Sequence, residues 1–463
     1  MKQQTLAKAI SLSGTGLHTG QFAELTIKPA AEDEGYVFFR VDLEKSPKVV
    51  ADPDSVFSTA RGTSLKVGEV EVHTVEHVLS ALYGMGIDNA HIELTGPEVP
   101  ILDGSALPFV KGIQEAGIVS LEKEREIFVP NQPIHYKDEA TGAALSLYPA
   151  DKFELITLVD FESDVIGEQY ASLKDMSSYA DQIAPSKTFV FVREIENLID
   201  RGLIKGGSLD NAIVIADEKI PQKTLQRLSE RMQKHEVTAS DSGILNRSDL
   251  HFVNEPARHK LLDVLGDMAL LGQFIQARVM AVKPGHKANV AFTSLMKKAW
   301  LEHKKNMDRP KYDPSIPPIY DTQKIEQTLP HRFPFLMVDK IIELTENKVV
   351  GIKNISADQY FFQGHFPNNP VFPGVLQLEA MAQTGGILAL STVDDPENWD
   401  TYFLKIDKVR FKQKVVPGDT LILKLEMMSP IRRGICFMRA EAYVADDLVS
   451  EGELTAQIIK RTS

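Results

Sequence analysis

Cysteine is nearly absent from this sequence of 463 residues, which contains only Cys436. One cysteine cannot form a disulfide within the chain, and it cannot build a zinc site that depends on several thiolates. No apolar run has the length of a membrane span, and the first residues have no apolar stretch as long as that of a signal peptide. We therefore expect a protein of the reducing cytoplasm without stable membrane insertion.

Positive charge is also scarce, since 51 lysine and arginine residues stand against 64 aspartate and glutamate residues, a formal net charge of −13. This balance argues against a protein that binds nucleic acid or an anionic membrane. What the chain does contain, 43% hydrophobic and 25% charged residues, is typical of soluble globular domains. A chain of this length exceeds one ordinary core, so we expect two or three domains.

Residues 259–267 predict a buried helix with one polar stripe. His259, Asp263 and Asp267 lie four positions apart from one to the next, which places them on one helical face. The other faces are apolar, so the stripe must find partners inside the fold. Imidazole and carboxylate at this spacing can bind one divalent ion, and zinc suits the pair. A buried hydrogen-bonded histidine and aspartate is the alternative that spacing leaves open.

A second helix is predicted near Thr74, which is the expected N-cap. The order of Glu76 and His77 differs from the H-E-x-x-H motif of zinc peptidases. We expect His77 to complete a metal site with His259 and Asp263, leaving a fourth position for water. Glu76 is then the candidate base, because the first turn of a helix favours an ionised carboxylate.

The predicted elements occur in the same order in residues 1–125 and 126–303. In both stretches two strands precede the helix that carries the metal ligands and one strand follows it. The strands are expected at 23–27, 37–41 and 91–94, and again at 144–148, 153–159 and 276–282. This order predicts a duplicated α+β unit whose two helices face each other with the metal between them.

Two stretches of the second repeat lie outside this order. Residues 191–215 predict a strand, an amphipathic helix and a second strand, a βαβ insert that either encloses an apolar chain or serves ordinary packing. Residues 216–254 are highly charged and predict an exposed helix and loop.

Residues 304–320 are rich in proline and charge, which predicts a semi-rigid linker. Residues 321–463 then predict an independent domain in which a sheet wraps around an apolar helix that follows Pro373. Its four long strands are expected at 402–414, 420–428, 435–444 and 448–459.

Glu379 lies within that apolar helix. Burial raises the pKa of a glutamate, so one placed there is usually paired or functional. His365 lies in a loop between turns rich in glycine and proline. By itself it indicates a solvated histidine, whereas together with Glu379 it can form an acid and base pair.

Six strings in the first 300 residues match one family. They are Gly16-Leu17-His18-Thr19-Gly20, Thr74-Val75-Glu76-His77, Leu102-Asp103-Gly104-Ser105, Lys187-Thr188-Phe189, Arg258-His259-Lys260-Leu261-Leu262-Asp263 and Gly285-His286. This part resembles the UDP-3-O-acyl-N-acetylglucosamine deacetylases, zinc amidases of lipid A synthesis built from two α/β sandwiches of two layers each. The charged stretch 216–254 is longer than expected in that family, so no substrate contact is expected there.

The deacetylase resemblance implies one zinc ion per chain. The implied ligands are His77, His259 and Asp263. Glu76 is then the general base for the attacking water, and Thr188 donates to the developing oxyanion. His286, kept cationic by Asp267, stabilises charge and protonates the leaving amine. The implied substrate contacts are Phe189 and Lys260 at the sugar nucleotide, and Leu17, Ile195, Ile204 and Gly207 along the acyl chain.

Five strings after residue 320 match a different family. They are Leu329-Pro330-His331-Arg332, Phe362-Gln363-Gly364-His365-Phe366-Pro367, Phe372-Pro373-Gly374-Val375-Leu376, Leu378-Glu379-Ala380-Met381-Ala382-Gln383 and Val416-Pro417-Gly418-Asp419. This part resembles the 3-hydroxyacyl-[acyl carrier protein] dehydratases with the hot-dog fold, a sheet wrapped round a central helix. The resemblance implies no cofactor in this domain.

The dehydratase resemblance assigns His365 to the removal of the α-proton and Glu379 to the protonation of the departing hydroxyl. Gln383 is expected to orient Glu379, and the Gly374 amide to polarise the thioester carbonyl. In this family the acid and the base come from different subunits, which implies at least a dimer, with a trimer of dimers as the assembly expected.

Arg410, Lys412 and Lys414 alternate on a predicted strand face and suit an acidic acyl carrier protein, although a solvated face is the alternative. The sequence as a whole predicts a bifunctional enzyme, a zinc deacetylase joined to a dehydratase. A hot-dog thioesterase or isomerase, or a scaffold without activity for oligomerisation and carrier binding, is the other interpretation of the carboxy-terminal part.

Overall fold

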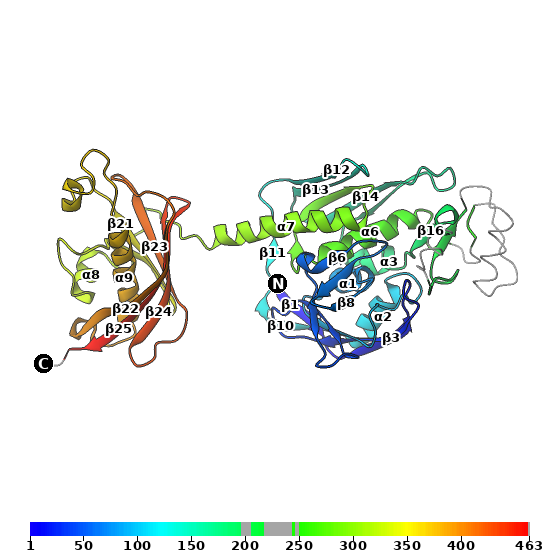
Figure 1. Ribbon diagram of the computed structural model, residues 1–463, viewed down its shortest axis with the longest axis horizontal. Helices are drawn as coiled ribbons and strands as arrows, with labels where there is room; N and C mark the ends of the chain where they lie inside the picture. The colour runs from blue at the N-terminus through cyan, green and yellow to red at the C-terminus, as the bar shows by residue number, and fades with distance from the viewer. Residues whose placement is uncertain (196–204, 217–242, 246–249, 462–463) are drawn as a thin grey trace. The chain divides into compact units, whose positions relative to one another are not determined.

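The computed structural model describes residues 1–195, 205–216, 243–245 and 250–461. It confirms the predicted α+β class. The chain divides into two compact units, Met1–His303 and Lys304–Ser463, and each is described by itself (Figure 1). Within the described residues, no helix combines the length and the apolar character that a membrane crossing requires.

Two five-stranded sheets with the same topology form the frame of the first unit. In the spatial order of each sheet, the second strand pairs antiparallel with the first and with the third. The third and fourth strands pair in parallel, and the fourth and fifth pair antiparallel. The first sheet has the order β2 (Ile10–Thr15), β3 (Phe22–Pro29), β9 (Ala90–Leu94), β4 (Tyr36–Arg40) and β5 (Lys48–Val50). The second has the order β12 (Ile134–Asp138), β13 (Ala143–Pro149), β19 (Ala277–Val282), β14 (Glu154–Asp160) and β15 (Glu168–Leu173). The matching orders confirm the predicted duplication.

The helices α1 (Glu76–Gly84) and α6 (Glu255–Ala269), one from each repeat, pack directly against each other. Gly266 allows this approach, because a Cβ atom at that position would lie 2.1 Å from the backbone oxygen of Glu76. Apolar side chains of both repeats join one hydrophobic core, so each helix is buried on nearly every face.

The predicted N-cap of α1 is wrong. Val75 occupies the N-cap position and makes no side-chain capping bond. Thr74 adopts a positive φ of 57°, and its hydroxyl donates to the buried Glu98 at 2.9 Å. A tertiary hydrogen bond thus replaces the local cap that the sequence suggests.

Shorter elements complete the first unit. They are β1 (Lys2–Leu6) paired with β10 (Ile118–Glu124), β11 (Ile127–Phe128) paired with β18 (Phe274–Ile275), the sheet of β6 (Val56–Ser58), β7 (Ser64–Val67) and β8 (Val70–Val72), and the helices α2 (Leu107–Ala116) and α3 (Tyr179–Gln182). The insert begins with β16 (Phe189–Phe191) and ends with β17 (Ile213–Ile215), which pair in parallel as predicted. Residues 196–204 and most of the charged stretch 216–254 lie outside the described residues.

A long helix, α7 (His286–Met307), is not predicted by the sequence pattern, and it extends past residue 304. The predicted linker therefore starts too early, because non-helical backbone begins only at residue 308. The far end of the predicted linker also pairs with the second unit, where Tyr320 forms an isolated bridge with Ile341.

One six-stranded sheet and one central helix form the second unit, as the hot-dog prediction requires. The strand order is β20 (Lys340–Leu344), β21 (Lys348–Asn354), β23 (Thr420–Met427), β24 (Ile435–Val444), β25 (Asp447–Lys460) and β22 (Trp399–Phe411), all antiparallel. The helix α9 (Gly374–Leu390) packs on this sheet, with α8 (Thr322–Thr328) beside it. Apolar side chains of α9 and of one sheet face form its core.

Two details of this unit differ from the sequence prediction. The strand β22 ends at Phe411, and its pairing with β25 shifts between Asp407 and Arg410, so Lys412 and Lys414 do not continue one alternating strand face. Glu379 is also not fully buried, because its side chain retains 18% of its accessible surface.

Candidate functional site

A cavity of about 270 Å³ opens where α1 and α6 meet the insert. Nearly all the residues predicted to act in the first unit line it, from elements far apart in the sequence. They are Leu17, Glu76, His77, Thr188, Phe189, Ile195, Gly207, His259, Lys260, Asp263 and His286. Asp267 lies behind His286, and Ile204 lies outside the described residues.

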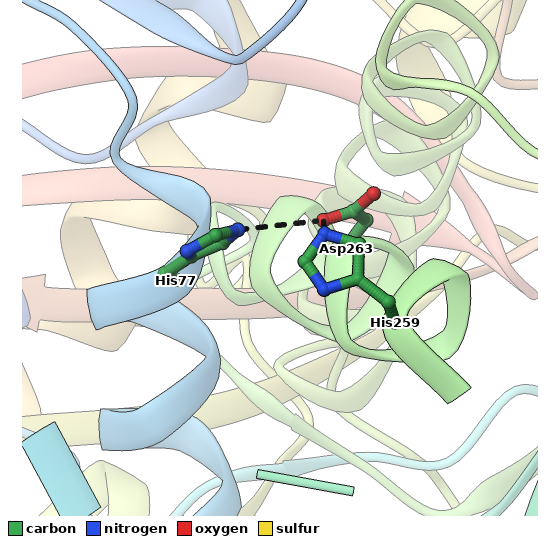
Figure 2. Close-up of side chains that lie close together, drawn as sticks. All are labelled: His77, His259 and Asp263. Atoms are coloured by element: carbon green, nitrogen blue, oxygen red, sulfur yellow. Dashed lines mark ion pairs between the residues drawn. The ribbon is translucent and has the colours of Figure 1, made fainter. Parts of the chain in front are cut away.

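Three side chains converge on one point of this cavity. His77 comes from α1, and His259 and Asp263 come from successive turns of α6 (Figure 2). One ligand atom from each lies within 4.8 Å of the other two, and all three residues are buried. The Oδ1 atom of Asp263 is 3.4 Å from Nε2 of His259 and 3.9 Å from Nε2 of His77.

Their protonation states suit metal binding, which needs neutral imidazoles and an ionised carboxylate. Burial, reinforced by His259, lowers the pKa of His77 to about 3. Burial also lowers the pKa of His259. Burial by itself would raise the pKa of Asp263, but Lys260 and the nearby histidines hold that pKa below its usual range. This set of two nitrogen donors and one oxygen donor fits a divalent ion and leaves room for a further ligand.

A backbone contact sets the orientation of one imidazole. Nδ1 of His259 lies 3.1 Å from the backbone oxygen of Ser186, to which it can donate. That hydrogen bond leaves Nε2 of His259 free to bind a metal, the usual arrangement for a ligating histidine.

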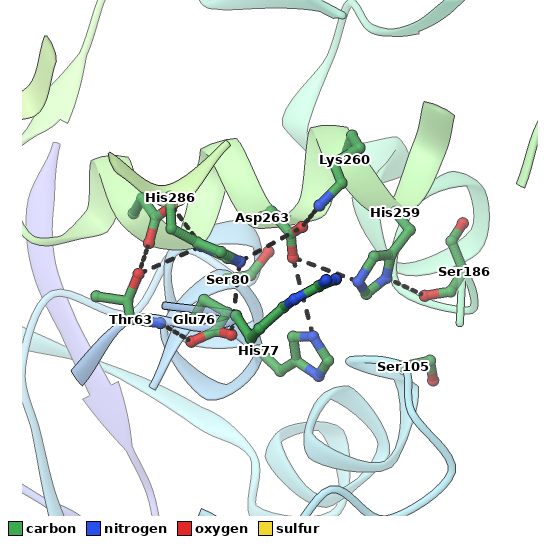
Figure 3. A network of polar contacts seen from close by, with 12 residues as sticks. Thr63, Glu76, His77, Ser80, Ser105, Ser186, His259, Lys260, Asp263 and His286 are labelled. Atoms are coloured by element: carbon green, nitrogen blue, oxygen red, sulfur yellow. Dashed lines mark hydrogen bonds and ion pairs between the residues drawn. The ribbon is translucent and has the colours of Figure 1, made fainter. Parts of the chain in front are cut away.

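Glu76 begins α1 and points into the same network (Figure 3). Its Oε2 accepts a hydrogen bond from the backbone nitrogen of Thr63 at 3.0 Å, and its Oε1 lies 3.9 Å from Nε2 of His286. Burial raises the pKa of Glu76 to about 7, despite the opposing charge of His286. A carboxylate with this pKa can accept a proton near neutral pH.

His286 forms a buried pair with Asp267, whose Oδ2 lies 2.9 Å from Nδ1 of His286. Burial lowers the pKa of His286, but Asp267 and Glu76 outweigh it and raise that pKa to about 9. Asp267 also accepts hydrogen bonds from the hydroxyl of Thr63 and from the side chain of Asn289. Sequence reasoning missed both of these partners, and Thr63 lies 204 positions from Asp267 in the chain.

The remaining predicted residues hold defined places around the metal ligands. The backbone of Thr188 donates to the backbone oxygen of Gly104 at 2.8 Å, which ties it to a turn of the first repeat. The Lys260 ammonium lies 5.5 Å from the Phe189 ring centre, but it also contacts Asp263 at 2.9 Å, a pairing that the sequence does not predict.

Leu17 and His18 reach the cavity from a loop that Glu98 anchors. This buried carboxylate accepts from the backbone nitrogens of His18 and Thr19 at 2.9 and 2.8 Å, and from the Thr19 hydroxyl. His18 belongs to a matching motif but is not predicted as a site residue, and nothing in the sequence indicates Glu98.

Glu379 lines a cavity of about 300 Å³ in the second unit. Nε2 of Gln383, one helical turn further along α9, donates to Oε1 of Glu379 at 2.8 Å. His331 and Phe335 also line this cavity, and most of the remaining wall consists of apolar or small residues of α9 and the sheet, among them Gly385, Met438 and Ile458. Such walls can accommodate an alkyl chain.

His365 lines a different and more open cavity, together with Gly374, Lys412 and Lys414. Its Nδ1 lies 2.8 Å from the backbone oxygen of Val371, so a donated hydrogen bond there leaves Nε2 to accept a proton. Within one chain the structure therefore brings Gly374 to His365 and Gln383 to Glu379, but it does not bring His365 and Glu379 into one cavity.

Comparison with known proteins identifies both parts. The family model of UDP-3-O-acyl N-acetylglycosamine deacetylase (LpxC) matches residues 3–238 and 233–298, and that of the FabA-like domain matches residues 329–453. A bifunctional enzyme LpxC/FabZ of Bacteroides thetaiotaomicron is 48% identical over 460 residues, and one of Porphyromonas gingivalis is 49% identical over 460 residues. Both alignments cover 99% of this chain and 99% of the relative.

A single-function relative matches the first unit alone. The UDP-3-O-acyl-N-acetylglucosamine deacetylase of Geotalea uraniireducens is 38% identical over 291 residues, 63% of this chain and 86% of the relative. These findings confirm both resemblances. The chain belongs to the family of bifunctional LpxC/FabZ enzymes, in which a UDP-3-O-acyl-N-acetylglucosamine deacetylase is joined to a FabA-like dehydratase domain.

Proposed function

We propose that the first unit removes the acetyl group from UDP-3-O-(3-hydroxyacyl)-N-acetylglucosamine with one zinc ion held by His77, His259 and Asp263. The observation that carries this proposal is the buried convergence of these three residues beside Glu76. Zinc, when bound, supplies a Lewis acid that makes water acidic enough to attack at neutral pH.

Side chains of the protein transfer the protons and stabilise the oxyanion. Glu76, whose pKa is about 7, takes a proton from the attacking water. The hydroxyl of Thr188 donates to the oxyanion that develops on the acetyl carbonyl. His286, whose pKa of about 9 keeps it protonated, delivers a proton to the leaving amine, and Asp267 holds it in place.

Substrate binding uses the rest of the cavity. Lys260 and Phe189 contact the sugar nucleotide. The 3-hydroxyacyl chain lies along Leu17, Ile195 and Gly207. The apolar character of the described wall supports this assignment.

The test compares the intact chain, a chelated sample, a zinc-restored sample and the Glu76→Ala variant in a deacetylase assay, with metal content measured on each. Loss of activity with chelation, recovery with stoichiometric zinc and loss in a variant that still binds zinc are the expected results. Deacetylase activity that is unchanged by both chelation and the substitution would disprove the proposal.

For the second unit, we propose dehydration of 3-hydroxyacyl-[acyl carrier protein] to the trans-2-enoyl product in a homodimer. His365 of one copy removes the α-proton, and Glu379 of the other protonates the departing hydroxyl. The separate cavities of His365 and Glu379 within one chain support the need for a second copy. The full assembly in this proposal is a trimer of dimers, as the family resemblance implies.

Mixed dimers test this arrangement. Homodimers of His365→Ala and of Glu379→Ala are expected to be inactive, whereas co-expression of the two variants recovers activity because one site of each mixed dimer keeps both residues. No recovery in purified mixed dimers would contradict the shared site. Formation of an enoyl thioester from a 3-hydroxyacyl thioester, without hydrolysis, separates a dehydratase from a thioesterase or a scaffold.

We also propose that the protein works in the cytoplasm, where its single cysteine stays reduced. The acyl carrier protein is acidic in this interpretation and docks near His365, where Lys412 and Lys414 line the cavity. Arg410 precedes them on β22.

A further inference from the structure

His331 lies beside the carboxyl group of Glu379. Its Nε2 is 3.7 Å from Oε1 of Glu379, and both side chains line the same cavity. Its ring stacks on Phe335, with ring centres 6.4 Å apart. Its Nδ1 is buried without a hydrogen-bond partner among the described residues. Within the described part of the chain, Glu379 is therefore the polar side chain that the imidazole approaches through Nε2.

Gln383 does not hold the Glu379 carboxyl group by itself. Its Oε1 accepts from the backbone nitrogen of Met337 at 2.7 Å, and the two N–H groups of its Nε2 donate to Oε1 of Glu379 and to the backbone oxygen of Phe335, each at 2.8 Å. The single hydrogen bond from Gln383 reaches Oε1 of Glu379, the same oxygen that Nε2 of His331 approaches, so it does not by itself fix the rotation of the carboxyl group about its Cγ–Cδ bond. His331 is the neighbour placed to limit it.

We propose that His331 is a positioning residue that orients the carboxyl group of Glu379 for proton delivery to the departing hydroxyl. The imidazole acts as a hydrogen-bond partner through Nε2, and it neither gains nor loses a proton in the reaction. The present 3.7 Å is longer than a hydrogen bond, as is common for catalytic groups before substrate binds. The inference rests on the proposed role of Glu379.

Two substitutions separate a hydrogen bond from ring packing. His331→Gln can place an amide nitrogen near the position of Nε2, whereas His331→Phe keeps a ring on Phe335 but removes the polar atom. We expect His331→Phe to lower the dehydratase kcat about ten- to a hundredfold, the effect of one lost hydrogen bond to an ionisable group, with little change in KM. The His331→Gln variant should keep most of the dehydratase kcat of the unchanged protein.

Thermal unfolding of each full-length variant controls for folding of the second unit, and the deacetylase activity of every variant should stay unchanged. Glu379→Gln is measured in parallel. Full dehydratase activity in Glu379→Gln would overturn the role of Glu379 and the inference with it. An inactive Glu379→Gln with a fully active His331→Phe would overturn the inference alone, and so would an equal loss in His331→Phe and His331→Gln.

Discussion

The two sites of this chain are assembled in different ways. The deacetylase site draws on both repeats, because α1 supplies Glu76 and His77 and α6 supplies His259 and Asp263 across a direct helix contact. In the second unit a single helix serves two cavities. Gly374 and Glu379 lie five positions apart on α9, a rotation of about 140° around the helix axis, so they face different cavities.

The second half of an active site can therefore come from either of two sources. A duplicated unit carries its own second helix, so one folded chain brings together the groups proposed for the deacetylase site that the structure describes. A unit with one central helix has no such partner, so we infer that the partner is another copy. Internal duplication and dimerisation solve the same geometric problem.

The two sites separate most sharply in the variants Glu76→Gln and Glu379→Gln. Each removes a proton-transfer group, so each should lower one activity by about 10²–10⁴-fold and leave the other unchanged. Both activities are measured on each purified full-length variant. Thermal unfolding of each variant controls for folding of the substituted unit, and a parallel fall of both activities in either variant would contradict the separation of the two sites.

The pH dependence of the deacetylase activity should also distinguish the first unit from the second. The proposed mechanism needs an ionised Glu76 and a protonated His286, so kcat/KM should rise as pH passes the pKa of Glu76 at about 7 and fall as pH passes the pKa of His286 at about 9. Asp267→Asn removes the anion that raises the pKa of His286. The fall of kcat/KM at high pH should therefore occur at a lower pH in this variant, and its deacetylase activity at pH of about 8 should drop about ten- to a hundredfold.

The matched control for Asp267→Asn is Asp138→Asn, which removes a carboxylate that contacts the exposed Lys287 at 3.4 Å and lies outside the cavity. Its pH profile should coincide with that of the unchanged protein. An unshifted fall of kcat/KM at high pH in Asp267→Asn would mean that Asp267 does not control the protonation of His286.

Dilution should affect only the dehydratase. At a chain concentration ten times below the dimer dissociation constant, roughly one chain in seven is paired, and dehydratase activity per chain should fall accordingly. Deacetylase activity per chain should stay constant over the same series. Sedimentation measures the dissociation constant independently, and dehydratase activity that persists in the monomer would contradict a shared site.

The smallest expected effect concerns the carrier protein. Lys414→Glu reverses a charge beside His365 and should raise KM for a carrier-linked substrate about fivefold, equivalent to about 1 kcal/mol for one exposed charge. A small thioester substrate without the carrier should show no change. Lys460→Glu, on a lysine that does not line this cavity, is the matched control, and an equal effect of both variants would argue against a local docking site.

Periodicity along the chain predicts much of the deacetylase centre. The spacing of His259, Asp263 and Asp267 needs only the helical repeat to place them on one face, and their complete burial follows from the apolar positions around them. The duplicated order of strands and helices likewise follows from the sequence pattern. Roles for Thr188, His286 and Glu379 come from family resemblance and stay proposals.

Local signals fail where a distant residue competes for the same group. Thr74 is predicted to cap α1, but its hydroxyl bonds to Glu98, 24 positions away. Lys412 and Lys414 are expected to alternate with Arg410, but the strand shifts its register and ends at Phe411. Neither Glu98 nor a register shift has a signature in the neighbouring sequence.

Sequence patterns predict the helical faces, the repeated unit, the sheet around an apolar helix and the candidate residues for metal binding and proton transfer. These properties depend on contacts along one element, where the backbone repeat fixes which side chains are neighbours. Three findings come from the folded structure alone: Thr63 contacts both Glu76 and Asp267, His331 approaches Glu379, and Glu379 and His365 line different cavities. Those contacts join separate elements, and their positions depend on the packing of the whole unit.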